Sequence, residues 1–197
     1  TWHGVANVFL LPLFVEGLRR SRACVQAWPP RASLMAAGWS PVRWRSAAGV
    51  GRLCLLLTAA AMLGAGATIL AVGMTRIFVP EDLQFIGASV EQLQAISPRL
   101  IPLIAHDRAG FGGGLATTGL VMLCIVWKAP PRRHVWQALL AGGVFGFGSA
   151  IGVHYGIHYL FITHLGPAWA GAALFFIGMW LSRRMYGIGP SARSPSM

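Results

Sequence analysis

The chain has 197 residues and a formal net charge of +11, and 55% of its residues are apolar while only 11% are charged. Soluble domains carry about 25% charged residues, so this chain has too few polar side chains to cover a water-facing surface. Its mean hydropathy of +0.61 and its long apolar blocks exclude an ordinary soluble enzyme. The sequence therefore predicts an all-α fold, a polytopic integral membrane helix bundle.

The N-terminal part, residues 1–50, is predicted to be a basic segment on the cytoplasmic side of the membrane. Its apolar stretch 2–18 is barely long enough to span a bilayer, Pro12 interrupts it and Glu16 lies near its end. The stretch is predicted either as an interfacial helix or as a fifth span that runs from outside to inside. Both alternatives leave the arginines that follow on the inner side.

Four later stretches are predicted to cross the membrane: 51–74, 111–127, about 135–159 and 167–182. Their lengths approach the ~20 apolar residues needed to cross a hydrocarbon layer about 30 Å thick. Pro167 is expected in the first turn of the last helix, where proline is favoured. Residues 51–182 are thus predicted to form the transmembrane bundle, and residues 183–197 a cytoplasmic tail.

The distribution of basic residues predicts the orientation. If the N-terminal segment is inside, only Arg76, Arg99 and Arg108 of the 16 Lys and Arg residues lie outside. The positive-inside rule then predicts a multi-pass protein of an inner or cytoplasmic membrane, with loops 19–50 and 128–134 and the C-terminus in the cytoplasm. Basic residues scattered along one membrane face indicate contact with anionic lipids, and not binding of nucleic acid.

The outer loop, residues 75–110, is predicted to contain two short helices along the membrane surface. Ser89 and Gln92 have the spacing of a capping box, which predicts the start of the first helix, and Pro98 ends it. The second is the apolar piece 100–106, which leads into the sequence HDRAGFGGG. The two helices are interpreted either as a lid over the ends of the spans or as a binding surface for a partner.

The sequence HDRAGFGGG precedes the second span. Asp107 and Arg108 are expected to pair where that helix starts, because an acidic side chain suits the positive end of a helix. Gly112, Gly113 and Gly114 have no side chains, so a neighbouring helix or a flat ligand can come close to the backbone there. Helix packing is the favoured interpretation. A phosphate-binding loop is disfavoured, because no strand precedes these glycines and no Lys-Ser/Thr follows them.

The third span contains glycines at every fourth position, at Gly148, Gly152 and Gly156. Such a ridge lets helix backbones approach closely in lipid, so it is predicted to be a helix-packing face. At 100° per residue, His154 and His158 lie about 200° away from the ridge. They are therefore expected on the opposite face of the same helix, four residues apart.

Four histidines are expected at one membrane depth near the outer side together with Asp107: His106, His154, His158 and His164. They are candidate cofactor-binding residues, for a divalent metal ion or as the axial ligand of a (bacterio)chlorophyll magnesium. The alternative is that each imidazole bonds a backbone carbonyl or lies among lipid headgroups. A haem held by two histidines is disfavoured, because it needs imidazoles from opposing helices.

Three sequence segments carry a resemblance to a known family: FVPEDLQFIG, SPRLIPLIAHDRAGFGGGL and the pair GVHYG and HLGPA. Over about residues 75–182 the chain resembles a family of small bacterial multi-span membrane proteins, with HDRAGFGGG as the most specific motif. Some members carry the name dihydroorotate dehydrogenase, which does not fit, because this chain has neither the length nor the periodicity of a flavin-binding barrel. The resemblance also suggests an accessory subunit of a photosynthetic or respiratory complex.

The function expected from the sequence is that of a non-catalytic accessory or scaffolding subunit of a larger bacterial membrane complex, plausibly a photosynthetic reaction centre or a respiratory complex. Its partners would be other membrane subunits and anionic lipids, and no catalytic motif is present. The alternative is a membrane-embedded redox or metal-dependent enzyme that uses the outer histidines. A small transporter ranks third, because the middle of the spans holds no acidic residue, lysine or arginine.

Overall fold

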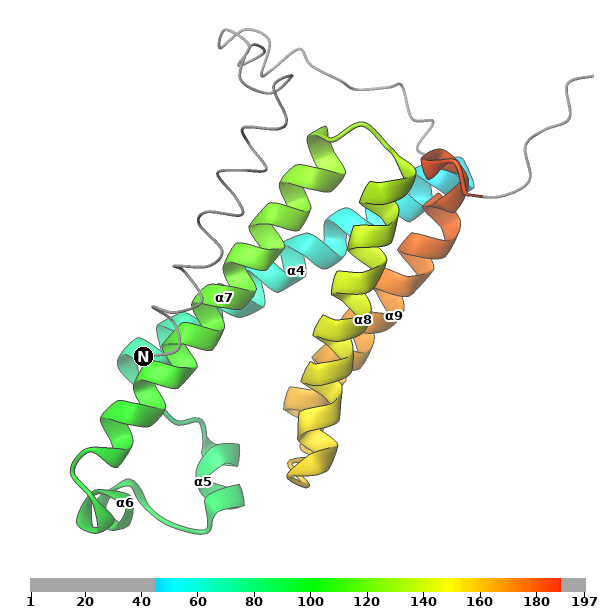
Figure 1. Ribbon diagram of the computed structural model, residues 1–197. Coiled ribbons are helices and arrows are strands. Elements are labelled where there is room, and N and C mark those ends of the chain that lie inside the picture. Colours follow the sequence, from blue (N-terminus) through cyan, green and yellow to red (C-terminus); the bar gives the residue numbers. More distant parts are fainter. Residues whose placement is uncertain (1–44, 189–197) are drawn as a thin grey trace, which may run out of the picture. The chain divides into compact units, whose positions relative to one another are not determined.

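The computed structural model describes residues 45–188. These residues form only helices, six α-helices and one 3₁₀ turn (Figure 1). In chain order they are α4 (Ala47–Thr75), α5 (Pro80–Ile86), α6 (Val90–Ile96), α7 (Leu100–Lys128), α8 (Arg133–Gly156), α9 (Ile162–Ser182) and η1 (Arg183–Tyr186). The apolar stretch 2–18, the Thr1 to Trp44 segment that contains it, and residues 189–197 lie outside the described residues.

Helices α4, α7, α8 and α9 with η1 are long and apolar enough to cross a membrane, with mean hydropathies of 2.1, 1.8, 1.4 and 1.4. This confirms the predicted all-helical fold with four spans. Because successive spans alternate in direction, the start of α4, the turn between α7 and α8 and the end of α9 lie at one end. We call this the basic end; its basic residues are Arg45, Arg52, Lys128, Arg132, Arg133, Arg183 and Arg184.

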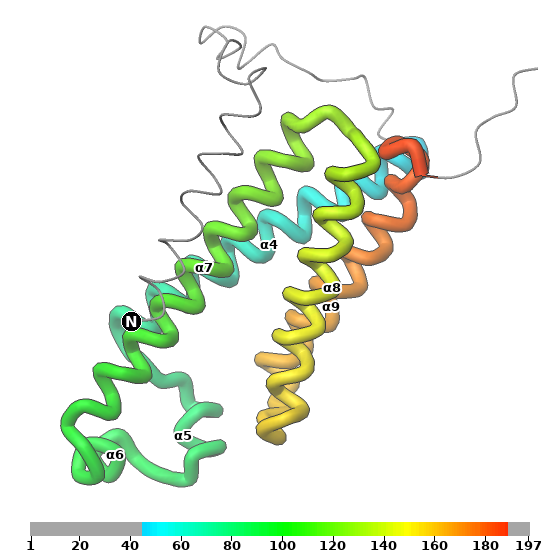
Figure 2. Tube along the Cα trace, viewed as in Figure 1, coloured from blue at the N-terminus to red at the C-terminus, as the bar shows by residue number. Residues whose placement is uncertain are grey.

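Helices α5 and α6 lie at the opposite end, which we call the loop end (Figure 2). Helix α6 begins as predicted, because Gln92 N–H donates to Ser89 Oγ over 3.3 Å and Ser89 N–H donates to Gln92 Oε1 over 2.7 Å. These two hydrogen bonds confirm the predicted capping box at Ser89. Helix α5 begins with Pro80, whose missing N–H costs nothing in a first turn.

The other predicted short helix, 100–106, does not exist as a separate element. Helix α7 begins at Leu100 and continues through these residues into the span. Pro102 does not break it, because the first N–H groups of a helix have no partner within the helix. Asp107 and Arg108 consequently lie inside α7 and not at its start, which corrects their prediction as a helix-start pair.

Two further boundaries differ from the sequence prediction. Helix α8 ends at Gly156, and His158 has a left-handed backbone with φ of 58°, so His154 and His158 do not share a helical face. Helix α9 begins at Ile162, which puts Pro167 inside the helix and not in its first turn. In lipid a backbone N–H or C=O without a partner is costly, which favours helices that extend past their apolar core.

Helices α4 and α7 are packed backbone to backbone. A Cβ atom built on Gly112 would lie 2.8 Å from the carbonyl oxygen of Gly66 and 2.9 Å from Leu70 Cα. One built on Gly119 would lie 2.8 Å from the carbonyl oxygen of Ala59, and one on Gly73 would lie 2.9 Å from the Ala109 nitrogen. Since no side chain fits in these places, glycine is what allows the two helices to touch.

The apolar core is divided along the bundle. A cluster of buried residues toward the basic end comes from α4, α7 and α9, among them Leu55, Met122, Phe175 and Met179, and partly buried side chains of α8 such as Trp136 pack against it. A second cluster at the loop end is built on Phe78, Leu93 and Ile101, which lie in or beside α5, α6 and α7. No residue of α8 or α9 belongs to this second cluster. The four spans therefore share a core only toward the basic end.

Candidate functional site

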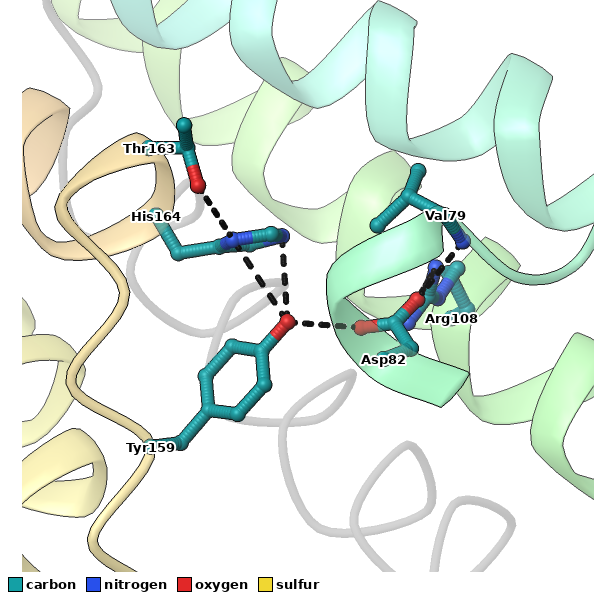
Figure 3. Close-up of polar contacts among 6 residues, drawn as sticks. All are labelled: Val79, Asp82, Arg108, Tyr159, Thr163 and His164. Carbon is teal, nitrogen blue, oxygen red and sulfur yellow. Dashed lines mark hydrogen bonds and ion pairs between the residues drawn. The ribbon is translucent and has the colours of Figure 1, made fainter. Parts of the chain in front are cut away.

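The carboxylate of Asp82 joins three separate parts of the chain at the loop end (Figure 3). Its Oδ2 accepts hydrogen bonds from the Val79 N–H over 2.9 Å and from Arg108 Nη1 of α7 over 2.8 Å. Its Oδ1 accepts the phenolic O–H of Tyr159 over 2.8 Å, from the connection between α8 and α9. The side chain of Asp82 is 10% exposed and that of Arg108 is 23% exposed, so the ion pair is largely screened from water.

Local sequence explains why Asp82 is in this position. It is the third residue of α5, where a carboxylate can accept the N–H of the residue that caps the helix. The positive end of the short helix also stabilises a negative charge there. Once Asp82 is fixed by its own helix, its remaining lone pairs are available to Arg108 and Tyr159.

The contacts of Asp82 and Tyr159 set their protonation states. Burial raises the pKa of Asp82, but the hydrogen bonds from Arg108, Val79 and Tyr159 lower it more, so that the pKa lies below its ordinary value. Burial and the hydrogen bond to the Asp82 carboxylate raise the pKa of Tyr159 above its ordinary value. At neutral pH the carboxylate is therefore charged, and the phenol keeps its proton and donates a hydrogen bond to Asp82.

Tyr159 is also the centre of an aromatic cluster. Its ring centroid lies 4.9 Å from that of Phe85 of α5 and 5.3 Å from that of Phe161, both at edge-on angles. The imidazoles of His164 and His154 lie 5.0 Å and 5.8 Å away. Only 8% of the surface of Tyr159 is exposed. Tyr159 therefore links the segment between α8 and α9 to α5 through ring packing as well as through its hydroxyl.

Of the four predicted histidines, His154 and His164 lie beside Tyr159. Nδ1 of His154 lies 2.6 Å from the carbonyl oxygen of Ala150 and donates to it, because a carbonyl oxygen only accepts; in the neutral imidazole Nε2 then carries the lone pair. The hydroxyl of Tyr159 is 3.4–3.5 Å from both ring nitrogens of His164, which is too long for a strong hydrogen bond. The cluster thus offers one directed imidazole lone pair, that of His154.

The other two predicted histidines lie elsewhere. His106 pairs with its neighbour Asp107 over 3.2 Å, and both side chains are more than 70% exposed, at 73% and 74%. His158 is exposed at the turn after α8. All four histidines lie toward the loop end, but His106 and Asp107 form an exposed pair of their own and do not join His154 and His164 beside Tyr159. Within residues 45–188, no group of three or more His, Cys, Asp or Glu side chains is arranged to hold a metal ion.

The predicted packing glycines divide into two groups. Gly112 lies in the α4–α7 contact, whereas a Cβ atom on Gly113 or Gly114 would have no neighbour within 4 Å. The ridge of α8 is equally open: no atom of the described chain lies within 4 Å of a Cβ built on Gly148, Gly152 or Gly156. The α8 ridge therefore makes no close contact with residues 45–188, and its role as a helix-packing face stays a prediction.

An open apolar groove of about 460 Å³ runs between α8 and α9. Glycines of the ridge form part of one wall, and large side chains form the other. The lining residues include Phe147, Gly148, Gly152, Trp169 and Phe176. The groove and the glycine ridge together form one surface that the described chain leaves uncovered.

Asp82 and Tyr159 are the site residues that sequence reasoning missed. The signal for Asp82 was its place two residues after Pro80, at the third position of a short helix. Tyr159 gave no such signal, because its partner is 77 residues away in the sequence. Sequence reasoning instead assigned Arg108 to its neighbour Asp107.

Fold and site together define a multi-pass helical membrane protein whose loop end is closed by a buried Asp–Arg–Tyr cluster. No family model matches the chain, and comparisons with curated proteins and with solved structures found no similar protein.

Proposed function

We propose that the protein is a non-catalytic accessory subunit of a larger bacterial membrane complex and that α8 packs against a transmembrane helix of a neighbouring subunit. The supporting observation is the exposure of α8. Only 6% of its most apolar stretch is buried within the described chain, against 28% for α4, 22% for α7 and 33% for α9. In this respect α8 differs from the other three spans.

The glycines of α8 strengthen this proposal. A glycine inside a helix costs about 1 kcal/mol relative to alanine, so a glycine needs a compensating contact. In α4 and α7 the glycines Gly66, Gly73, Gly112 and Gly119 gain that contact from each other's helix, whereas Gly64, Gly110, Gly113 and Gly114 have none. In α8 five glycines have none within the described chain: Gly142, Gly146, Gly148, Gly152 and Gly156. A partner helix would supply the missing packing.

The groove beside the ridge supports the same partner. A large apolar side chain of a neighbouring helix fits between the flat surface of Gly148 and Gly152 and the rings of Trp169 and Phe176. The charges support the orientation: the basic end faces the cytoplasm and its anionic lipids, and the loop end faces the outside of the bacterial inner membrane.

The proposal is tested by extracting the native membrane with a lipid-preserving polymer and sizing the particles that contain the chain. We expect a complex larger than the monomer, which is lost when Gly148 and Gly152 are both replaced by leucine. Gly64→Leu is the matched control, because Gly64 also has open space around it but lies on α4. A wild-type monomer, a complex of identical chains alone, or a complex that survives the double substitution would contradict the proposal.

A narrower version places the complex in photosynthesis or respiration, with a pigment or an ion at His154. The supporting observation is the hydrogen bond to Ala150, which leaves Nε2 of His154 in the form that binds a magnesium or another divalent ion. The test is the visible absorption and metal content of the purified complex. Both should fall in His154→Ala and stay unchanged in His106→Ala, whose imidazole is exposed beside Asp107.

The runner-up function, a membrane-embedded redox or metal-dependent enzyme, predicts something different. A bound redox group or metal would then remain with the isolated monomer after the partner contact has been broken. A Gly148→Leu, Gly152→Leu double variant that is monomeric and still carries the absorption band would favour the enzyme. A monomer without the band would favour the accessory subunit.

A further inference from the structure

The bundle is asymmetric in how its two halves are held together. Near the basic end, α9 touches α4 directly: a Cβ on Gly51 would lie 2.6 Å from the Ser182 nitrogen and 2.8 Å from the Gly178 carbonyl oxygen. Trp136 of α8 also donates from Nε1 to the carbonyl oxygen of Met179 over 3.1 Å. At this end the α8–α9 hairpin is fixed to the remaining helices by backbone contact and a shared core.

At the loop end the connection is of a different kind. The second core cluster contains residues in and beside α5, α6 and α7 but none of the hairpin. What reaches across from the hairpin is Tyr159, through its hydrogen bond to Asp82 and its edge-on contact with Phe85. Asp82 in turn is tied to α7 by Arg108. Tyr159 thus holds the hairpin to the α5–α7 side through one carboxylate (Figure 3).

We propose that the Asp82–Tyr159 hydrogen bond is a latch that keeps the loop ends of the α8–α9 hairpin and the α4–α7 pair together. When the latch opens, the hairpin swings about its contacts with α4 at the basic end. The shared core there stays intact, because it lies on the far side of the hinge. This motion is a property of the isolated chain and does not depend on a partner subunit.

The geometry suits a latch better than a permanent joint. A permanent joint would use packed apolar surface, as α4 and α7 do along their glycines. Here a single O–H donor meets a charged acceptor that already has two other donors, from Arg108 and Val79. When Tyr159 leaves, Oδ2 of Asp82 keeps its bonds to Arg108 and Val79 and only Oδ1 loses its donor, so opening does not leave the buried charge unpaired.

The test measures distances between spin labels in lipid nanodiscs, using a chain whose three cysteines are replaced by alanine. One label pair, at Leu103 and Val153, reports on the loop end, because both positions are exposed and lie near the start of α7 and the end of α8. A second pair, at Val121 and Gln137, reports on the basic end.

Tyr159→Phe removes the hydroxyl and keeps the ring, so it tests the hydrogen bond alone. We expect a longer-distance population at the loop end that is at least about tenfold more abundant than in the wild type, which is the size of effect of one hydrogen bond to a charged group. The distances at the basic end should not change. Tyr155→Phe is the matched control, because Tyr155 is 51% exposed, and it should leave both pairs unchanged.

Asp82→Asn provides the second arm. It replaces the charged acceptor of Tyr159 by a neutral amide and should produce the same long-distance population, and combining it with Tyr159→Phe should lengthen the loop-end distance no further, because both variants act on the same hydrogen bond between the hairpin and α5. The proposal is overturned if Tyr159→Phe gives the wild-type distances at the loop end. It is equally overturned if both ends change together, since the hairpin would then be loosened as a whole and not released at a latch.

Discussion

Nη2 of Arg52 in α4 donates a hydrogen bond to the carbonyl oxygen of Trp127 at the end of α7, over 2.8 Å. Nε of the same guanidinium donates to the carbonyl oxygen of Val126 over 3.1 Å. The last carbonyls of a helix have no partner within the helix, and a positive charge there also interacts favourably with the helix dipole. Arg52, only 5% exposed, thus closes the C-terminal end of α7.

Replacing Arg52 by methionine should therefore destabilise the bundle by about 2–4 kcal/mol, because two charged hydrogen bonds are lost and the carbonyls of Val126 and Trp127 are left without these donors. Arg52→Lys should recover only part of this loss, since an ammonium lacks the planar fork that reaches both carbonyls. The measurement is reversible unfolding in mixed micelles. Arg45→Met is the control, because Arg45 is exposed, and an equal loss there would refute the role of Arg52.

Neighbouring glycines in α7 should respond in opposite ways to alanine. Gly112→Ala places a methyl group against the backbone of α4 and should cost about 1–3 kcal/mol, the usual penalty for overpacking. Gly113→Ala meets open space and should be neutral or stabilise α7 by up to about 1 kcal/mol through helix propensity. Unfolding measurements on the two single variants compare them directly, and equal effects would show that α4 and α7 do not touch at Gly112.

The stability of the loop end should fall in acid. The folded-state pKa of Asp82 lies below its ordinary value, so the folded protein binds this proton less readily than the unfolded chain does. The contribution of Asp82 to folding stability is therefore present above its pKa in the unfolded chain, about 3.9, and is lost as the pH falls through its pKa in the folded protein. The charged or titratable groups that face Asp82 are Arg108 and Tyr159, and Glu81, its neighbour in the chain, acts on Tyr159.

The corresponding measurement is limited proteolysis of residues 76–99 at a series of pH values down to the acid limit of the protease. Cleavage should increase below about pH 4 in the wild type. In Asp82→Asn it should be faster at neutral pH and change little with acid. This variant keeps His154 and His164. If acid accelerates its cleavage as much as that of the wild type, the effect belongs to groups other than Asp82.

His158 should tolerate glycine. Its φ of 58° is a left-handed conformation that costs an L-residue about 1–2 kcal/mol and costs glycine almost nothing. Since glycine also gains freedom in the unfolded chain, we expect His158→Gly to leave the unfolding free energy unchanged or to raise it by up to about 1 kcal/mol. A loss of more than that amount would show that the imidazole makes a stabilising contact.

The sequence alone determined the four spans and the start of α6. Hydropathy suffices for the spans, because a helix that crosses lipid must be apolar along most of its length whatever its neighbours are. The capping box at Ser89 and Gln92 was predictable for the same reason: both hydrogen bonds form within four residues of chain. The starts of α7 and α9 were not predicted, since both helices begin several residues before the apolar stretches 111–127 and 167–182.

Only the tertiary structure decided which residues make up the candidate site and which glycines pack. Gly112 and Gly113 are identical in sequence terms, and the rotation of α7 against α4 decides which one meets Gly66. Arg108 has an acidic neighbour at Asp107, yet it pairs with Asp82, 26 residues earlier, because Asp107 points to the exposed side with His106. Contacts between residues so far apart in the chain depend on how the helices pack against one another, and local sequence patterns do not determine that packing.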